Sequence, residues 1–398
     1  MKIPAKYRLG FWRATFFLLM AVGLVFTTIR FTSGLGAVTN LTDKYPWGMW
    51  KAFNVLVAIG LGGAGFTIMG LVYVFNARNF RAVVRPVVLM AFLAYSSAAA
   101  ALVIDIGRSW TIWHPIVMWN HSSVLFEVAW CLMLYTGVLM LEGSGMLFEK
   151  MGWNKLVKIQ HAVTLPIVIV GVVLSTLHQS SLGSLFLIVP GKLHALWYTP
   201  ILPVLFFTSA ICVGLAMILV LSRITARAFN RRLEMPVLTE LGRVLIAAIT
   251  VFGITRMVDL WVTGAMPLAF QFTYEAGMFW AEFLLFVPIP FLILATPRRR
   301  AHLGTLYAGG LCVVAGFILN RLNVCITGFE AAQGGSYLPS IGEIAIGLMV
   351  VAAVFAVYRL AVQYLPVYPE VRIPETGFRV LKSPARERVA SSRPQAAG

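Results

Sequence analysis

Charged residues are scarce in this chain. Asp, Glu, Lys and Arg make up 12% of its 398 residues, whereas 59% of the residues are hydrophobic. Soluble globular domains carry about 25% charged residues, so this composition excludes an ordinary soluble protein. Apolar runs long enough to cross a bilayer recur along the whole chain, and the sequence therefore predicts an integral membrane protein with many spanning helices.

Cysteine is also rare, and its spacing argues against a redox centre built on sulfur. The chain has four cysteines, none of them in a C-x-x-C pair, and most lie inside apolar runs: Cys131, Cys212, Cys312 and Cys325. They are expected to be small core residues rather than disulfides or ligands of an iron–sulfur cluster. No metal site is predicted.

Histidine is too sparse to favour a haem. A b-type haem held between helices needs two histidines at matching depth on facing helices, and among the six histidines of the chain only His121 and His178 come close. His161 and His178 fall in one predicted helix about 25 Å apart, too far to ligate one iron. The chain also has no C-x-x-C-H motif. The sequence therefore predicts a protein without haem.

The hydropathy pattern predicts ten membrane spans and an all-α fold. The first is expected to remain as an uncleaved helix, because its apolar part is too long for a signal peptide. The predicted spans are 10–31, 48–75, 86–107, 121–142, 157–177, 200–221, 238–261, 274–296, 304–321 and 339–363.

Basic residues alternate with the loops. All but seven of the 32 Lys and Arg fall in the N-terminal segment, in alternate connections or near the C-terminus. By the positive-inside rule this places both termini in the cytoplasm, in agreement with an even number of spans. Because the net charge of +17 is spread over these connections, nucleic acid is not an expected partner. Residues 1–365 form the predicted membrane domain, and residues 366–398 a basic cytoplasmic tail.

Two pairs of acidic residues indicate an internal repeat. Asp105 and Glu127 have counterparts in Asp259 and Glu282, at offsets of 154 and 155 residues. The offsets divide the core into two four-helix bundles, spans two to five and spans six to nine, with spans one and ten at the flanks.

Polar residues inside the spans gather in the predicted outer half of the membrane. Glu127 lies seven residues, or roughly 10 Å of helix rise, beyond the predicted start of its span. At that depth a carboxyl group is expected to line a cavity, to carry protons or to pair with a cation such as Arg256. Glu282 is a similar case. His178 ends its span in STLHQSSLGS, where an imidazole suits a quinone carbonyl or a proton relay.

Five motifs in order give the chain a family resemblance. They are PWGMWKAFN, RPVVLMAFLAYS, IDIGR, WNHSSVLFEVAWCLMLYTGVLMLE and LHQSSLGSL. Together they resemble the NrfD/PsrC family of quinone-reactive membrane subunits, named for polysulfide reductase. The likeness is greatest to the ten-helix branch typified by HybB, the membrane subunit of a nickel–iron hydrogenase.

The resemblance implies a function in a respiratory complex of the bacterial inner membrane. Such a protein binds menaquinone or ubiquinone near the periplasmic side and exchanges electrons with a periplasmic, ferredoxin-like, four-cluster iron–sulfur subunit. A nickel–iron hydrogenase or a molybdenum enzyme would be the catalytic subunit. Glu127, His178 and Arg85 match family positions for quinone protonation or proton conduction. One position departs from the hydrogenase-linked members, where an acidic residue is expected in place of Asn54, and this weakens the case for proton translocation.

These arguments give three predicted groups of residues within a quinone oxidoreductase subunit. The expected catalytic residues are Glu127, His178, Asp105 and Arg108. The expected quinone-binding residues are Asn54, His178, Tyr45 and His121. The expected proton path comprises Glu127, Arg85, Glu142 and Glu282. Two alternatives stay open: a secondary transporter, indicated by the broken-helix patterns LGGAGF and LPIVIV, and a passive membrane anchor.

Overall fold

The computed structural model describes residues 10–229 and 234–368. Within these ranges, ten helical segments are long and apolar enough to cross a membrane, which confirms the predicted all-α membrane protein. The spans are α1 (Phe11–Ser33), η3 to η4 (Trp50–Val74), α4 (Arg81–Asp105), α6 (Val124–Met151), α7 (Asn154–Ser184), α8 (Leu202–Phe229), α9 (Met235–Val262), α10 with α11 (Tyr274–Leu294), α13 to α14 (Leu303–Gln333) and α15 (Ile341–Tyr364). The predicted tail lies outside the described residues from residue 369 onward.

The second span is not one regular helix. It consists of the π-helical η3 (Trp50–Val57), α2 (Ala58–Gly62), α3 (Ala64–Met69) and the π-helical η4 (Gly70–Val74). The interruption at Gly63 falls in the predicted pattern LGGAGF, whereas Pro166 of LPIVIV lies inside a continuous α7. A Cβ atom on Gly214 of α8 would lie 2.9 Å from the backbone nitrogen of Ala64. Small residues therefore let the second and sixth spans touch backbone to backbone, as in many membrane helix pairs.

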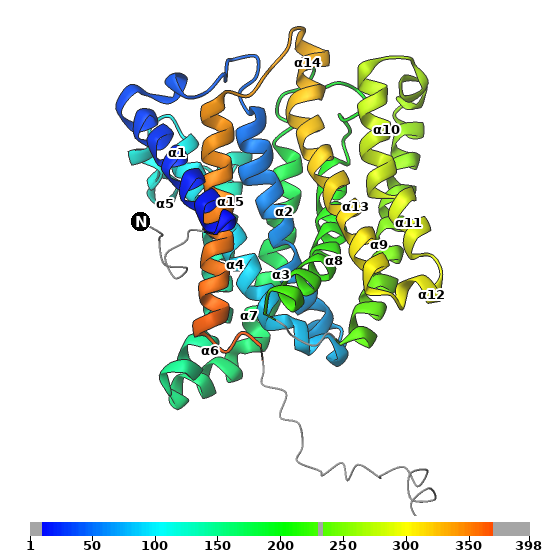
Figure 1. Ribbon diagram of the computed structural model, residues 1–398. Coiled ribbons are helices and arrows are strands. Elements are labelled where there is room, and N and C mark those ends of the chain that lie inside the picture. The colour runs from blue at the N-terminus through cyan, green and yellow to red at the C-terminus, as the bar shows by residue number, and fades with distance from the viewer. Residues whose placement is uncertain (1–9, 230–233, 369–398) are drawn as a thin grey trace, which may run out of the picture. The chain divides into compact units, whose positions relative to one another are not determined.

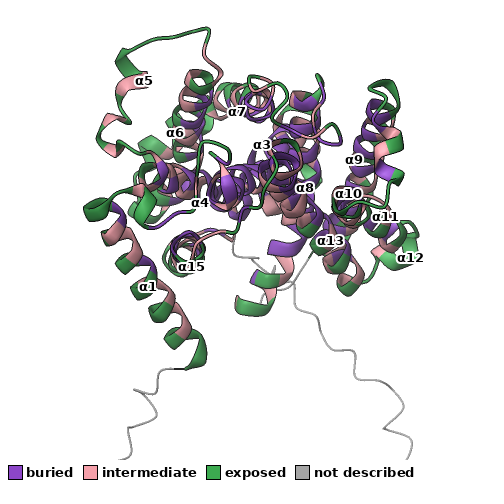
Figure 2. Ribbon diagram, turned by 90° about the horizontal axis from the view of Figure 1, so that it is seen from above, coloured by how far each residue is buried: buried purple, intermediate pink, exposed green. Residues whose placement is uncertain are grey.

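Two four-helix bundles follow the predicted repeat. In the first, α4 packs against α2, α3 and α6, and α7 packs against α6 and α3; in the second, α8 packs against α9 and α13, and α10 packs against α13. The bundles meet where α8 contacts α3 and α7. The first and last spans, α1 and α15, pack against each other beside α4 (Figure 1). Figure 2 shows the buried residues concentrated on the central α3, α4 and α8.

The two ends of the bundle differ in their connections. Long connections, residues 34–49, 106–123, 185–201, 263–273 and 334–340, form what we term the long-loop end. The opposite, short-loop end carries residues 75–80, 152–153 and 295–302. The connections contain the short helices η2 (Leu35–Ala37), η5 (Arg78–Phe80), η6 (Ser109–Thr111), α5 (His114–Val117), η7 (Met266–Phe270) and α12 (Pro297–Arg300). Assignment of the short-loop end to the cytoplasm stays a prediction.

Hydroxyl side chains fix several helix starts at the long-loop end. Ser123, Thr273 and Ser340 accept a hydrogen bond from the backbone N–H three residues later, at the starts of α6, α10 and α15. Such N-caps satisfy one of the backbone donors that a helix leaves unpaired in its first turn.

Candidate functional site

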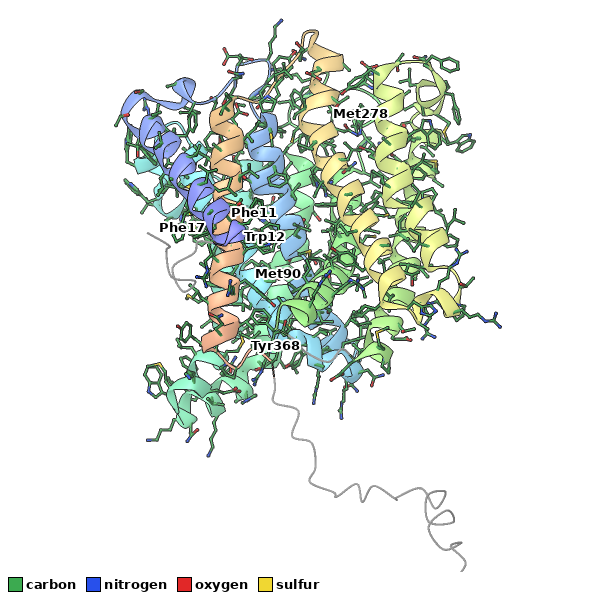
Figure 3. All side chains as sticks on the ribbon, in the orientation of Figure 1. Phe11, Trp12, Phe17, Met90, Met278 and Tyr368 are labelled. Carbon is green, nitrogen blue, oxygen red and sulfur yellow. The ribbon has the colours of Figure 1, made fainter. Side chains whose placement is uncertain are left out.

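A cavity of about 1,010 Å³ runs along the flank of the bundles. Its walls come from α1, the second span, α4, α8, α13 and α15. Most of its lining is aliphatic or aromatic; Figure 3 labels two of these side chains, Trp12 on α1 and Met90 on α4. Its polar groups include an amide, Asn54, from the half of the second span nearer the long-loop end, and three arginines near the short-loop end. The volume is at the upper end of the range for small-molecule sites, and an apolar wall with few polar groups is their usual chemistry.

Asn54 is the polar group that the second span presents to this cavity. It lies in the π-helical turn η3, a local irregularity that is frequent at functional sites, and it is 4% exposed. Its side-chain amide has no hydrogen-bond partner in the described structure. Across from it, a Cβ atom on Gly347 of α15 would lie 3.2 Å from the Asn54 Oδ1. An unpaired amide in an apolar wall can both donate to and accept from a polar ligand.

A second group of polar side chains lies inside the first bundle. The ring of Tyr95 packs 5.6 Å from that of His178 and 4.7 Å from that of Tyr135, measured between centroids. Gln179 donates to the Ile59 carbonyl at 3.1 Å and to the Tyr95 hydroxyl at 3.4 Å. We call Tyr95, Tyr135, Ser175, His178 and Gln179 the buried polar column.

Several groups of the buried polar column have no partner. Both ring nitrogens of His178, the Ser175 hydroxyl and the Tyr135 hydroxyl are buried without a hydrogen bond. Unpaired buried groups of this kind are uncommon and call for an explanation, such as a proton-transfer role or bound water. His178 was expected to share a quinone site with Asn54, but the structure does not bring the two together. Asn54 faces α15, whereas α7, which carries His178, packs against α3 and η4 on the other side of the span (Figure 2).

The buried polar column continues toward the short-loop end. A Cβ atom on Gly171 would lie 3.7 Å from the ring of Tyr135 and 3.7 Å from the carboxylate of Glu142, so these two groups flank one position of α7. Glu142 also lines a cavity of about 130 Å³ together with Arg85 and Glu149. This volume is large enough for several water molecules.

Arg85 pairs with a residue that sequence reasoning missed. Its guanidinium donates to the two carboxylate oxygens of Glu149 at 2.9 and 2.5 Å, and to the Pro366 carbonyl at 3.1 Å. Arg85 and Glu142 were both expected in the proton path, and the structure places them in the lining of one cavity. A spacing of seven residues, which returns to one helix face every two turns, links Tyr135, Glu142 and Glu149, and this signal could have identified the missing carboxylate.

Glu127 lies at a shallower depth than its sequence position suggested. Helix α6 begins at Val124, because residues 120–123 form a turn that ends in the Ser123 cap, so Glu127 belongs to the first helical turn. Its side chain is exposed and accepts a hydrogen bond from the Ser181 hydroxyl at 2.5 Å. Arg256, which was one candidate cation for pairing with Glu127, instead donates to Asp259 at 2.9 Å, three residues along its own helix.

Asp105 ends α4 beside a lysine rather than beside Arg108. Its carboxylate lies 3.5 Å from Lys51 Nζ, is 3% exposed and makes no hydrogen bond. The backbone carbonyls around it accept hydrogen bonds from Arg30, at 2.6 Å for both Ile104 and Ile106. Arg108 is exposed. Lys51 was not singled out from the sequence, although it lies three residues before Asn54.

Two proposed quinone ligands lie in the long connections. The Tyr45 hydroxyl donates to the Gly334 carbonyl at 2.9 Å, which ties two connections together. His121 is exposed, with its ring 5.4 Å from that of Trp119 and 5.9 Å from that of Phe126. Neither residue lines the large cavity.

The second bundle holds a closed polar network around Glu282. Its carboxylate accepts hydrogen bonds from Trp197 Nε1 at 3.1 Å, Asn320 at 3.1 Å and Asn323 at 2.6 Å. Arg321 donates to Asn320 at 2.6 Å and to Ser209 at 2.7 Å, and its guanidinium lies 3.6 Å from the ring centroid of Phe206. Glu282, which the repeat relates to Glu127, is therefore buried and fully partnered, whereas its counterpart is exposed.

Curated relatives match most of the chain. A protein of Nitratidesulfovibrio vulgaris is 34% identical over 89% of this chain and 93% of its own length. The probable Ni/Fe-hydrogenase 2 b-type cytochrome subunit of Escherichia coli is 29% identical over 89% of this chain and 91% of its own length. The integral membrane subunit of menaquinone reductase from Nitratidesulfovibrio vulgaris is 28% identical over 90% of this chain and 92% of its own length.

One of these names corrects the expectation that the chain lacks haem. The Escherichia coli relative is described as a b-type cytochrome subunit, so the exclusion of haem from histidine spacing is wrong. In the described residues, His178 is a buried histidine whose ring nitrogens are both unpartnered, and it is the residue that could ligate a haem iron. Among the same residues, no group of three or more His, Cys, Asp or Glu could hold a metal ion.

The family assignment rests on most of the chain. The family profile described as "Polysulphide reductase, NrfD" matches residues 37–331, which run from the connection before the second span to the end of the ninth. This match confirms the resemblance inferred from the five sequence motifs. The chain belongs to the NrfD polysulphide reductase family of membrane proteins.

Proposed function

We propose that this chain is the quinone-reactive membrane subunit of a respiratory oxidoreductase of the bacterial inner membrane. The observation that carries the proposal is the large apolar cavity with the unpaired amide of Asn54 in its wall. A quinone has the matching chemistry, a polar head group that accepts hydrogen bonds and a long apolar tail. Relatives that are named as a menaquinone reductase subunit and as a hydrogenase subunit support it.

Asn54 would hold a quinone carbonyl oxygen through its amide N–H. An amide fixes and polarises the carbonyl, but it carries no proton of its own to the ring. Reduction of a quinone to a quinol consumes two electrons and two protons, so a titratable group must stand near the head group. The Lys51–Asp105 pair is the best candidate. Lys51 precedes Asn54 by three residues, and its Nζ lies 3.5 Å from the carboxylate of Asp105.

The electrons would come from an iron–sulfur subunit at the long-loop end. Asn54 is four residues, or about 6 Å of helix rise, from the start of its span at that end, so the head group would lie close to the surface where the partner docks. A nickel–iron hydrogenase or a molybdenum enzyme would provide the catalytic subunit.

The buried polar column would serve proton movement through the first bundle. His178, Tyr95 and Tyr135 lead toward Glu142, and the cavity beyond Glu142 reaches the Arg85–Glu149 pair. Tyr135→Phe would remove one hydroxyl from this route and leave the ring packing intact. In proteoliposomes, the variant should keep electron transfer to quinone and lose proton uptake from the short-loop side. Equal proton uptake in the variant and the parent protein would refute the route.

The proposed function is tested by two measurements, the binding of a quinone and its reduction. The purified chain should bind menaquinone or ubiquinone analogues, and together with its reduced iron–sulfur partner it should convert them to quinols. A secondary transporter or a passive anchor would do neither. The absence of both binding and reduction would overturn the proposed function.

A further inference from the structure

The short-loop end of the large cavity carries three arginines that the proposed function does not use. Arg223 and Arg227 come from the last turns of α8, and Arg359 comes from α15. Arg223 lies 5.1 Å from the ring centroid of Tyr307. None of the three has an ion pair or a hydrogen bond in the described structure. Three positive charges without acidic partners thus surround one end of an apolar cavity.

These arginines are far from the amide at the other end. Asn54 faces Gly347, and Arg359 follows Gly347 by twelve residues, or about 18 Å along α15. The wall between them is apolar and includes Val350, Val351 and Val354. A quinone head group held at Asn54 therefore does not reach the guanidinium groups, and the cavity has two chemically different ends.

We propose that the short-loop end of this cavity is a binding site for an anionic phospholipid. The phosphate would lie against Arg223, Arg227 and Arg359, and an acyl chain would extend into the apolar part of the cavity. Guanidinium groups bind phosphate oxygens through paired hydrogen bonds, which gives them an advantage over lysine at such a site. Basic pockets between spanning helices on the cytoplasmic side are typical sites for anionic head groups, and the positive-inside rule places this end in the cytoplasm.

The combination of charge and apolar volume selects this occupant. A free phosphate ion would use the arginines and leave the apolar cavity unexplained, and a quinone tail would fill the cavity without using the arginines. A phospholipid uses both. The last turns of α8 and α15 would then be held together by the head group, because Arg227 and Arg359 belong to different spans.

The experiment is native mass spectrometry of the full-length, delipidated protein in detergent. It compares dioleoyl-phosphatidylglycerol with dioleoyl-phosphatidylcholine, which differ in head group only. We expect tighter binding of phosphatidylglycerol, and each single substitution, Arg223→Gln, Arg227→Gln or Arg359→Gln, should weaken it about fivefold, the effect of roughly one charge near a membrane surface. The control Arg298→Gln removes an exposed arginine of α12 that lies outside the cavity, and it should leave the binding unchanged.

Other results would overturn the proposal. Equal binding of the two lipids would exclude a site for an anionic head group. If Arg298→Gln weakened phosphatidylglycerol binding as much as the cavity variants do, the binding would reflect the charge of the whole surface rather than a specific site. Displacement by excess inorganic phosphate would indicate a plain anion site. If a glutamine variant fails to fold, the triple Arg→Lys variant tests the same point, since it should keep the preference for phosphatidylglycerol. Quinone binding is measured separately, so failure of the proposed function leaves this test intact.

Discussion

The side-chain amide of Asn54 and the backbone of Gly347 are in such close contact that a methyl group on residue 347 would lie 3.2 Å from the amide oxygen. The three nearest side-chain or neighbouring-helix atoms to that position all belong to the amide of Asn54. Residue 347 therefore offers a way to displace the amide without changing any polar group.

Gly347→Ala should weaken quinone binding and leave the protein folded. The added methyl group displaces the amide from its position, and alanine is a better helix former than glycine, by about 1 kcal/mol in exposed helices. Titration with a quinone analogue should show an increase in Kd of about tenfold, equivalent to one lost hydrogen bond. The matched control is Gly137→Ala on α6, where the new methyl group meets no atom within 4 Å. A Kd equal to that of the control would show that the amide does not contact the quinone.

Glu282→Leu should destabilise the second bundle. The substitution leaves the N–H groups of Trp197, Asn320 and Asn323 without their acceptor in a buried site. Loss of a buried acceptor that is shared by three donors reduces the free energy of unfolding by about 2–4 kcal/mol. Unfolding in mixed micelles measures the loss. Glu240→Leu, which breaks an exposed ion pair with Arg243, is the control and should change stability by less than about 1 kcal/mol. Similar values for the two variants would contradict a structural role of the network.

The Arg85–Glu149 pair should contribute only modestly to stability. Its side chains are 36% and 29% exposed, so water screens the attraction despite the two-point geometry. A double-mutant cycle with Arg85→Gln and Glu149→Gln should give a coupling free energy of about 0.5–1 kcal/mol. The two substitutions should affect proton uptake more than stability: each single variant is expected to slow proton uptake from the short-loop side. A coupling near zero would mean that the pair does not form in the membrane.

The stability of the long-loop end should depend on the protonation of His194. Partial burial lowers the pKa of His194 from its ordinary value of 6.5, although the nearby Glu275 acts in the opposite direction. In the fold its Nδ1 accepts a hydrogen bond from the Leu196 N–H at 3.3 Å, which requires the neutral imidazole. Because the unfolded chain binds the proton more readily, stability should be constant above pH 6.5 and fall as the pH decreases from 6.5 through the lower pKa of the fold.

Melting curves between pH 8 and pH 5 would check the role of His194. His194→Leu should remove part of the acid sensitivity, whereas His302→Leu, at an exposed position of the short-loop end, should keep it. The prediction fails if the two variants show the same dependence on pH.

The sequence predicted the spans because the hydrophobic pattern determines them, and it predicted the two bundles from the spacing of four carboxylates. Bilayer thickness fixes the length of an apolar run, and the paired carboxylates identified the repeat. Starts and ends of spans were less well predicted. Glu127 was placed too deep because the predicted span began at residue 121, whereas the polar residues 120–123 form a turn and the helix begins only after the Ser123 cap.

Partners of charged groups could not be predicted from the sequence. Asp105 was grouped with Arg108 among the expected catalytic residues, but the structure pairs it with Lys51 of another span. Arg256 shows the opposite case, since it pairs with Asp259 on its own helix rather than with a distant carboxylate. The cavity could not be predicted either, because a space left between packed helices produces no periodic pattern in the sequence. Asn54 was identified, and the structure adds that its amide faces this cavity without a partner.

The most direct test of this account is the quinone affinity of Asn54→Leu in the purified, full-length protein. Ser97→Ala is the control, because it changes another polar residue in the wall of the same cavity. If the Asn54 amide holds the quinone carbonyl, the Kd for a menaquinone or ubiquinone analogue should rise about tenfold in Asn54→Leu and stay unchanged in Ser97→Ala. An unchanged Kd in a folded Asn54→Leu protein would contradict the central claim that the quinone binds at this amide.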